Sequence, residues 1–362
     1  MTEKMPIRLL KVCLLAAAVL CLACESLAAG RSKREPLSPV AVPDLELSGG
    51  RRLVFERIFA SDREVVVKRK FWTKVLDLVA GPPDFHKLER PYSIAVDSRG
   101  RVIVSDPGIP AVHIFDLARQ KYKFIFRDGK EPFRSPQCVA VDAQDNFYVT
   151  DSDAGKIFVF DPDGNFRRVI GSLRGGEGYF KRPTGIAVDS DAQRIYVTDT
   201  LRNKVFVLDM QGTVLQAIGK GGVAPGEFNF PTELKLVDQE LYVVDAMNFR
   251  VQILDRSGQF RAMLGGNQDG NLSMFRPKGI GIDSERNVYV VDGLGDQVQV
   301  FDRQGRLLYY FGGSGDGPEE FQLPAGLFIT RDDHVYVVDS YNRRVQVLRY
   351  VNPAQQAEAT KP

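Results

Sequence analysis

Six copies of one pattern constrain the fold of this 362-residue chain more than any other feature of its sequence. Each copy opens on a proline, and successive prolines lie 45 to 48 residues apart: Pro91, Pro136, Pro183, Pro231, Pro277 and Pro324. Each copy also has an aspartate at the end of an apolar run: Asp106, Asp151, Asp199, Asp245, Asp292 and Asp339. Self-similarity at this period is typical of arrays in which each repeat packs against the next.

Each copy divides into four short runs with the character of β-strands, here called a, b, c and d. In the third copy they read GIAVD, RIYVTD, KVFVLD and TVLQAIG, between residues 185 and 219. The c–d turn reads D-x-x-G in four copies, which suits a type I turn with aspartate first and glycine last. The pattern predicts an all-β fold: a six-bladed β-propeller of four-stranded antiparallel blades.

The ring has to close, because an open array leaves an unpaired strand edge at both ends. The last copy provides strands a, b and c and is followed by RYVNPAQQAEATKP. The segment TKVLDLVAG, residues 73–81, precedes the first copy and ends on a glycine, as strand d does elsewhere. We therefore expect an N-terminal strand, formed by residues 73–81, to complete the last blade and close the ring.

The motif P-x-G-I-A-V-D, followed by VYVVDSYNRRVQVL in the last copy, resembles the repeats of the NHL family of six-bladed propellers. The resemblance covers roughly residues 72–350. It is specific for the fold and implies little about function. Members of the family bind RNA in animals, act as extracellular sensor domains in bacteria, or catalyse peptide amidation as lyases.

The N-terminus has the pattern of an export signal. Three basic residues up to Lys11 precede an apolar run from Val12 to Cys24, which is too short to span a bilayer. Two processing routes stay open: lipidation of Cys24, within a lipobox-like CLAC, or cleavage after Ala28. With such a signal, the chain resembles a bacterial envelope lipoprotein of the NHL family.

The expected organisation follows from these patterns and from the Pro-, Ser- and charge-rich stretch after the signal. We predict a signal over residues 1–24, a flexible tether over 25–50, the propeller over 51–351 and a polar tail over 352–362.

The expected binding surface is the face that carries the d–a loops and the b–c turns, here called the top face. The aspartate that ends strand b occurs in all six copies, so we expect it to serve the blade by accepting a backbone N–H in the b–c turn. Residues that break the repeat are better site candidates. The predicted ligand-binding set, at the top face and the mouth of the central channel, is Tyr92, Gln137, Thr184, Glu233, Lys235, Lys278, Arg202, Arg250, Tyr341 and Arg343.

Three members of this set stand out in strand a, the strand nearest the axis. Glu233 and Lys278 stand in adjacent blades and can pair across the channel mouth. Lys235 replaces the alanine or glycine of four other copies, and we expect it to reach into a solvated channel, because an unpaired buried ammonium is costly. A ligand role and a channel that tolerates charge both explain it.

Catalysis has few candidate residues. Amidating lyases of the family hold zinc with histidines at the channel, whereas His86, His113 and His334 are expected on two different faces here. Glu233 is the only acidic residue among the strand-a starts, which makes a poor metal cage. We expect no metal and no cofactor. The alternative to a binding protein is a lactonase-like or amidating-lyase-like hydrolase or lyase near Glu233 and Lys235.

The sequence favours an exported, lipid-anchored, non-enzymatic binding or scaffold module of the cell envelope or periplasm. The expected partner is an envelope protein, peptide or polysaccharide, with the membrane reached through the lipid anchor only. A formal charge of +2 and the export signal argue against nucleic acid. We expect a monomer.

Overall fold

The structure is a computed structural model that describes residues 42, 44–65, 85–127, 131–175, 178–266 and 274–353. The chain divides into residues 1–42 and 43–362, and the ring lies within the second unit. The predicted signal, Cys24 and most of the predicted tether and tail lie outside the described residues. Among the described residues, no helix is long and apolar enough to cross a membrane.

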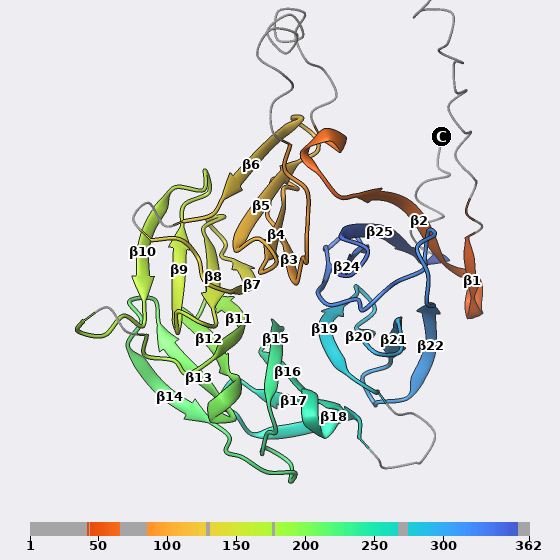
Figure 1. Cartoon of the computed structure of the whole chain (residues 1–362). Helices are drawn as coiled ribbons and strands as arrows, with labels where there is room; N and C mark the ends of the chain where they lie inside the picture. Colours follow the sequence, from red (N-terminus) through yellow and green to blue (C-terminus); the bar gives the residue numbers. More distant parts are fainter. Residues whose placement is uncertain are drawn as a thin grey trace, which may run out of the picture. The chain divides into compact units, whose positions relative to one another are not determined.

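Six antiparallel sheets form a ring (Figure 1). Blades 1 to 3 consist of β3 (Ser93–Val96) to β6 (Lys121–Ile125), with β4 (Val102–Asp106) and β5 (Ala111–Asp116); β7 (Pro136–Val141), β8 (Phe147–Asp151), β9 (Lys156–Phe160) and β10 (Phe166–Ile170); and β11 (Pro183–Asp189), β12 (Arg194–Asp199), β13 (Lys204–Asp209) and β14 (Val214–Ile218). Each follows the order a, b, c, d from the axis outward.

Blades 4 and 5 repeat this order. They consist of β15 (Pro231–Val237), β16 (Glu240–Asp245), β17 (Arg250–Asp255) and β18 (Phe260–Gly265), and of β19 (Pro277–Ile282), β20 (Val288–Asp292), β21 (Gln297–Phe301) and β22 (Leu307–Gly312). Blade 6 has β23 (Leu327–Ile329), β24 (His334–Asp339) and β25 (Arg344–Val351), and is completed from the N-terminus. The predicted fold class is confirmed.

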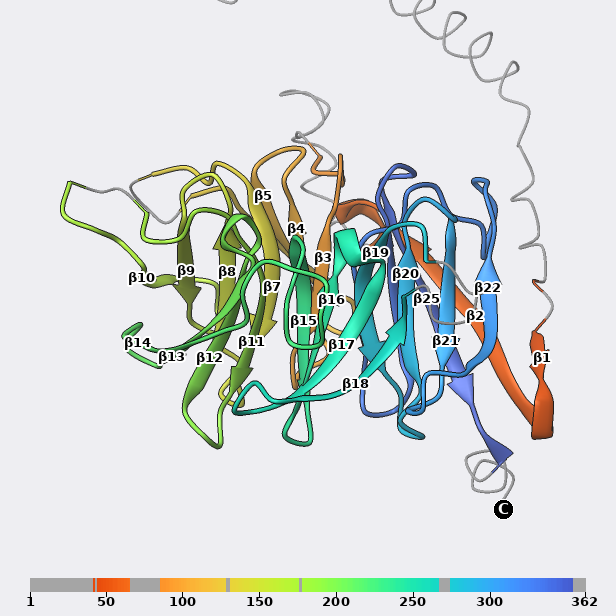
Figure 2. The ribbon, with the colours of Figure 1, turned by 90° about the horizontal axis from the view of Figure 1, so that it is seen from below.

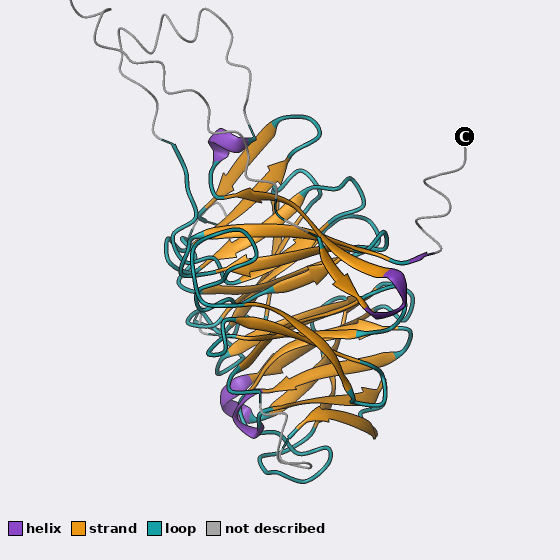
Figure 3. Cartoon of the chain, turned by 90° about the vertical axis from the view of Figure 1, so that its right-hand side faces the viewer, coloured by secondary structure: helices purple, strands orange, loops and turns teal. Residues whose placement is uncertain are grey.

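Strands b and c are apolar on both faces because each blade is covered by a neighbour on both sides. All five residues of β20 are buried, for example, whereas four of the five in β14, an outer strand, are exposed. Six apolar cores result, one between each pair of neighbouring blades. Figures 2 and 3 show the strands side by side through the depth of the ring, with turns at both ends.

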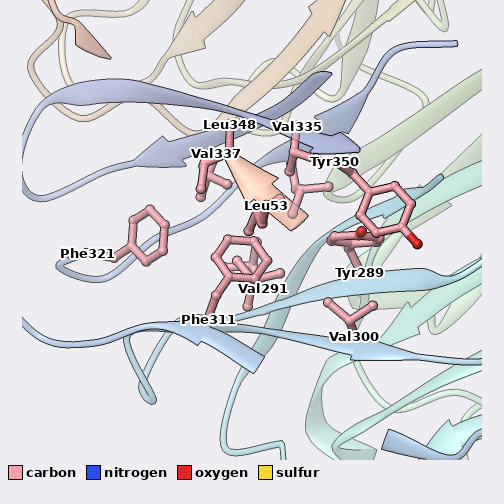
Figure 4. Close-up of a cluster of buried hydrophobic side chains, with 12 residues drawn as sticks. Leu53, Tyr289, Val291, Val300, Phe311, Phe321, Val335, Val337, Leu348 and Tyr350 are labelled. Carbon is pink, nitrogen blue, oxygen red and sulfur yellow. The ribbon is translucent and has the colours of Figure 1, made fainter. Parts of the chain in front are cut away.

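The strand that closes the ring is β2 (Arg51–Phe59), which pairs antiparallel with β25 from Arg52↔Val351 to Phe59↔Val345. A short β1 (Leu45–Leu47) then adds a fifth strand outside β2, after which η1 (Ser48–Gly50) forms the turn. Leu53 of β2 is fully buried in the core between blades 5 and 6 (Figure 4). The closure by an N-terminal strand is therefore confirmed.

The segment predicted for this strand is wrong. Residues 73–81 lie outside the described residues, and β2 occupies the place beside β25 that we assigned to them. In RRLVFERIF, three arginines and a glutamate interrupt the alternation of apolar and polar residues. The segment TKVLDLVAG, in contrast, resembles strand d of the other copies. The predicted tether range also contains β1, so the described ring begins before residue 51.

The chain continues from β2 into blade 1, through η2 (Asp62–Glu64). The Leu88 N–H donates to the Ala60 carbonyl at 2.8 Å, and Phe59 and Val65 pack in the core between blades 6 and 1. One N-terminal segment thus contributes to two neighbouring cores and ties the two ends of the array together.

The aspartate that ends strand b is fully buried in every blade and fixes the d–a loop that precedes the proline. Asp106 accepts the N–H groups of Glu89 and Arg90 at 2.6 and 3.0 Å, and Asp292 accepts those of Phe275 and Arg276 at 2.8 and 2.9 Å. Asp106 also accepts the Gly108 N–H of the b–c turn at 2.8 Å, as predicted. These carboxylates belong to the scaffold of the top face.

Candidate functional site

Strand a of three blades brings four side chains together at the axis, here called the axial cluster: Cys138, Glu233, Lys235 and Phe328. The Cys138 thiol of β7 donates to the Glu233 carboxylate of β15 at 3.1 Å. The Lys235 ammonium lies 3.5 Å from the other Glu233 oxygen and 5.6 Å from the Phe328 ring centre in β23. Lys235 therefore reaches across the axis from blade 4 toward blade 6.

A glycine in the intervening blade makes room for this contact. Cys138 belongs to blade 2 and Glu233 to blade 4, and blade 3 has Gly185 at the same position of strand a. A Cβ atom at Gly185 would lie 2.8 Å from the Glu233 Cα and 2.6 Å from the Thr232 carbonyl oxygen. A side chain at that point would push the strands apart, so only glycine allows blades 3 and 4 to approach this closely.

The axial cluster satisfies its own charges and contains no activated nucleophile. Glu233 is 5% exposed and Cys138 is 1% exposed. Burial raises the pKa of the Cys138 thiol well above its usual range, and the Glu233 carboxylate raises it further. A thiolate, which is the nucleophilic form of cysteine, is therefore disfavoured here. The arrangement suits a structural polar network better than a reaction centre.

Tyr92 lies beside the axial cluster, in the axial part of blade 1. Burial raises the pKa of its phenol, Cys138 and Glu233 raise it further, and the guanidinium groups of Arg276 and Arg182 lower it. These four groups come from blades 2 to 5, so the Tyr92 hydroxyl is within electrostatic reach of most of the ring. Among the described residues this hydroxyl has no hydrogen-bond partner.

Lys278 does not pair with Glu233, contrary to the pairing that we expected, because Lys235 and Cys138 occupy both Glu233 oxygens. Its aliphatic stem packs against Gly293 of the blade-5 b–c turn: a Cβ atom there would lie 2.9 Å from Lys278 Cε. Within the described part of the chain, Lys278 makes no ion pair or hydrogen bond. Burial, together with the nearby Arg276 charge, lowers the pKa of Lys278 to about 8.

The three predicted arginines are engaged by the protein itself. Arg250 is buried, and it pairs with Asp245 at 2.8 Å and donates to the Ala224 and Glu227 carbonyls, so the structure removes it from the accessible rim. Arg202 lies 3.4 Å from Asp199 and stacks on Tyr179. Arg343 reaches from blade 6 to Glu89 of blade 1 at 3.0 Å.

Thr184 and Gln137 have internal partners as well. The Thr184 hydroxyl is buried between those of Thr198 and Thr200, at 2.9 and 2.8 Å. Its carbonyl accepts from the Thr150 hydroxyl of the preceding blade at 2.5 Å, so Thr184 joins blades 2 and 3. The Gln137 amide donates to the Ser135 hydroxyl at 3.0 Å. Tyr341, by contrast, is 59% exposed.

The sequence analysis missed an exposed apolar surface on the top face. The second residue after the closing aspartate is a large hydrophobic one in blades 3 to 6, and Gly108 and Asp153 in blades 1 and 2. The d–a loops of blades 4 to 6 and one more turn position add four others. We call this set the apolar arc; its eight members are 38 to 60% exposed: Leu201, Phe230, Met247, Phe249, Phe275, Leu294, Leu323 and Tyr341.

Three members of the apolar arc have a backbone conformation that bulky residues rarely adopt. Phe230, Phe249 and Leu323 have φ values of 54°, 54° and 45°. Left-handed backbone at such residues is strained, and strain of this kind gathers at functional sites. Comparing the same turn position in all six copies would have revealed part of the arc in the sequence, but not the strain.

The histidines lie away from the axial cluster. His113 is fully buried in strand c of blade 1, where its Nδ1 meets the Tyr122 hydroxyl at 2.8 Å and its Nε2 lies 3.7 Å from Asp106. His334 starts β24 and lies 3.0 Å from Asp332. No group of three or more His, Cys, Asp or Glu side chains in the described ranges could hold a metal ion.

Comparison with known families gives the same architecture. A family model described as a 6-bladed beta-propeller matches residues 189–262 and 282–351, and the NHL repeat model matches residues 133–160. No curated protein sequence matches the chain.

Similar solved structures have different functions. A streptogramin B lyase shares 15% identity with a TM-score of 0.54, over 73% of this chain and 94% of that chain. An auxiliary nutrient binding protein from Bacteroides thetaiotaomicron shares 11% with a TM-score of 0.57, over 73% and 69%. A chain of the nidogen/laminin complex shares 21% with a TM-score of 0.50, over 74% and 91%. At these identities the likeness shows the fold alone.

The ring defines the class of protein: a six-bladed β-propeller, in which residues 133–160 match the NHL repeat. The fold is shared with a lyase and with binding proteins, so the function has to be argued from the site.

Proposed function

We propose that this protein is an exported, lipid-anchored scaffold that binds a protein or peptide of the cell envelope through its top face, without catalysis. The apolar arc is the observation that carries the proposal. Its eight side chains come from four consecutive blades and are held on rigid turns. Large exposed apolar side chains that gather on one face of a soluble fold indicate an interaction site.

The energetics of the apolar arc suit a macromolecular partner. Covering one large apolar side chain that is fully exposed stabilises a complex by roughly 1.5–3 kcal/mol. The arc side chains are about half exposed, so each contributes less, but eight together can offset an association cost of about 4–15 kcal/mol. The surface is therefore large enough for specific binding.

A polysaccharide fits the top face less well than a polypeptide. Polysaccharide recognition requires many free hydrogen-bonding groups, but Arg202, Arg250 and Arg343 already pair with carboxylates of this chain. The top face offers more exposed apolar side chains than free polar groups, and these pack well against the apolar side chains of a protein or peptide.

The alternative of a hydrolase or lyase at Glu233 and Lys235 has less support. A general base has to reach the proton that it abstracts. Glu233 is buried and held by a thiol and an ammonium group, and Lys235 leans on Phe328. The contacts of both residues are directed at other side chains of the ring.

Site-specific photo-crosslinking tests the proposal. A photoreactive residue at Leu294 on the top face should give one dominant protein adduct in cells of the organism that makes the protein. The matched control places it at Leu308, which is equally apolar and 46% exposed but lies on an outer strand. Adducts of equal yield at both positions, or no adduct at Leu294, would contradict the proposal.

Export and anchoring have a test of their own. Replacement of Cys24 by serine should move the protein from the membrane fraction to the soluble periplasmic fraction, because serine has no thiol to which the lipid can be attached. An unchanged distribution, together with a mature N-terminus after Ala28, would favour ordinary cleavage instead.

A further inference from the structure

We propose that Lys278, Arg276 and Arg182, together with the Tyr92 hydroxyl, bind a carboxylate of the partner, and that the apolar arc binds the hydrophobic residues on either side of it. This inference rests on the proposed function and adds the chemistry of the partner: a polypeptide segment with an acidic group flanked by apolar side chains.

The scaffold fixes the backbone of the three cations, here called the axial cations. Arg182 and Arg276 directly precede the prolines of blades 3 and 5, and their backbone N–H groups are fixed by Asp199 and Asp292 at 3.0 and 2.9 Å. Lys278 follows Pro277 at the start of β19, with its stem against Gly293. The backbone at these positions is thus fixed, whereas the Arg182 and Arg276 side chains are exposed and become ordered only when they bind an anion.

None of the axial cations has an anionic partner within the described ranges. The cations of the predicted set other than Lys278 do: Arg202, Arg250, Arg343 and Lys235 each pair with a carboxylate. Asp296 attracts the Lys278 ammonium, but the two side chains form no ion pair; the Asp296 carboxylate accepts the Leu323 N–H at 2.8 Å. A half-buried ammonium without a counter-ion is costly unless an anion completes it.

The Tyr92 hydroxyl and the axial cations share the region around the axis, because all four residues directly precede or follow a proline that opens a copy, where strand a begins. The electrostatic influence of Arg182 and Arg276 on Tyr92, and of Arg276 on Lys278, agrees with this placement. A carboxylate near the Tyr92 hydroxyl would receive one neutral donor and several charged ones, and charge-assisted hydrogen bonds are the stronger kind. The Glu233 carboxylate does not compete strongly with an incoming anion for the axial cations, because Lys235 and Cys138 already bind it.

The apolar arc adjoins the axial cations directly. Phe275 precedes Arg276 in the chain, and Leu294 follows Gly293, on which the Lys278 stem packs. An inorganic anion or a nucleic-acid phosphate would use the cations and leave the arc exposed. A peptide carboxylate with hydrophobic neighbours uses both, and for this reason we commit to a polypeptide.

Selection from a random peptide library displayed on phage, against the purified full chain, provides the probe. We expect peptides with Asp or Glu between large apolar residues. Binding of the selected peptide, measured by fluorescence anisotropy, should weaken about tenfold in Lys278→Met and in Arg276→Gln. It should be unchanged in Lys121→Met, which removes an exposed lysine at the start of an outer strand. Changing the peptide's acidic residue to its amide should weaken wild-type binding by a similar factor.

The other outcomes separate the two proposals. Apolar peptides without an acidic residue, insensitive to Lys278→Met but lost in Leu294→Asp, would overturn this inference and leave the proposed function in place. Peptides insensitive to both substitutions would overturn both. Equal competition by inorganic phosphate or a DNA oligonucleotide would show an anion site of another class and overturn the polypeptide assignment. Comparing a side-chain carboxylate with a free C-terminus, each with the other blocked as an amide, identifies the source of the carboxylate.

Discussion

The two faces of the ring use the same kind of aspartate turn but expose different chemistry. On the face of the a–b and c–d turns, here called the bottom face, aspartates bind their own turn or the next blade: Asp255 accepts two N–H groups of its own turn, at 2.9 and 3.0 Å, and Asp333 accepts the Ser284 N–H and hydroxyl of the neighbouring blade. None of the exposed large hydrophobic side chains lies in the described a–b and c–d turns.

On the top face, the aspartates are buried below the surface and the loops that they hold expose apolar and cationic side chains. The apolar arc and the axial cations lie there, and the latter have no counter-ions in the described part of the chain. The difference teaches that the repeat itself does not create a binding surface. It provides a rigid frame, and the variable turn positions of the top face provide the chemistry.

The largest expected difference between the faces concerns the buried aspartates. Asp245→Ala removes the acceptor of Arg250 Nε and Gln252 Nε2 and leaves a buried guanidinium unpaired, so we expect a loss of about 3–5 kcal/mol. Asp302→Ala in a bottom turn releases Arg306, which is 79% exposed, into water and should cost about 1 kcal/mol. Urea unfolding measures both. Equal losses of stability would show that the buried aspartate of the top face contributes no more than the aspartate of a bottom turn.

The next effect is a pH dependence at the bottom end of β19. Burial raises the pKa of Asp283 to about 6, against the opposing hydrogen bonds from Asn287. The folded protein then holds a proton that the unfolded chain releases above its usual pKa. Stability should fall as pH rises from about 4 to about 6, by about 1–3 kcal/mol. Asp283→Asn should flatten this slope in urea unfolding measured across the range. A slope that persists in the variant would show that another group titrates.

At the top end of the same strand we expect an effect of opposite sign. Because the pKa of Lys278 is lowered to about 8 by burial, the folded protein binds fewer protons than the unfolded chain between about pH 8 and 10.5. Stability should rise with pH across that window, and the cost of the charge is fully present at pH 7. Lys278→Met should therefore stabilise the protein at pH 7 by about 1–2 kcal/mol.

The gain should disappear near pH 11, where the wild-type lysine is neutral in both states. Lys121→Met, the exposed control, should change stability by less than about 0.5 kcal/mol at either pH. A destabilised Lys278→Met protein would mean that the ammonium already has a counter-ion.

The smallest effect on stability concerns the apolar arc. The double substitution Met247→Ser and Leu294→Ser should change the free energy of unfolding by less than about 0.5 kcal/mol, because both side chains are largely exposed. It should nevertheless reduce the fluorescence of bound anilinonaphthalene sulfonate, which reports on contiguous apolar surface. The control, Leu215→Ser with Leu308→Ser on two outer strands, should reduce it less. Equal reductions would show that the arc is not one surface.

The sequence by itself determined the blades, their four strands, their two faces and the scaffold role of the repeated aspartates. These features depend on local sequence and recur in six copies, so the copies can be compared with one another. It also singled out Glu233, Lys235 and Lys278, because departures from a repeat are visible without any structure.

The tertiary structure alone decided which segment closes the ring and which charges remain unpaired. Cys138 and Glu233 are 95 residues apart and meet because blade 3 places a glycine between them. Arg250 and Lys278 look equally free in the sequence, yet Asp245 and two loop carbonyls bury the first, and the second has no such partner among the described residues. Contacts across the axis depend on which side chains the closed ring brings together, and a local pattern carries no information about that.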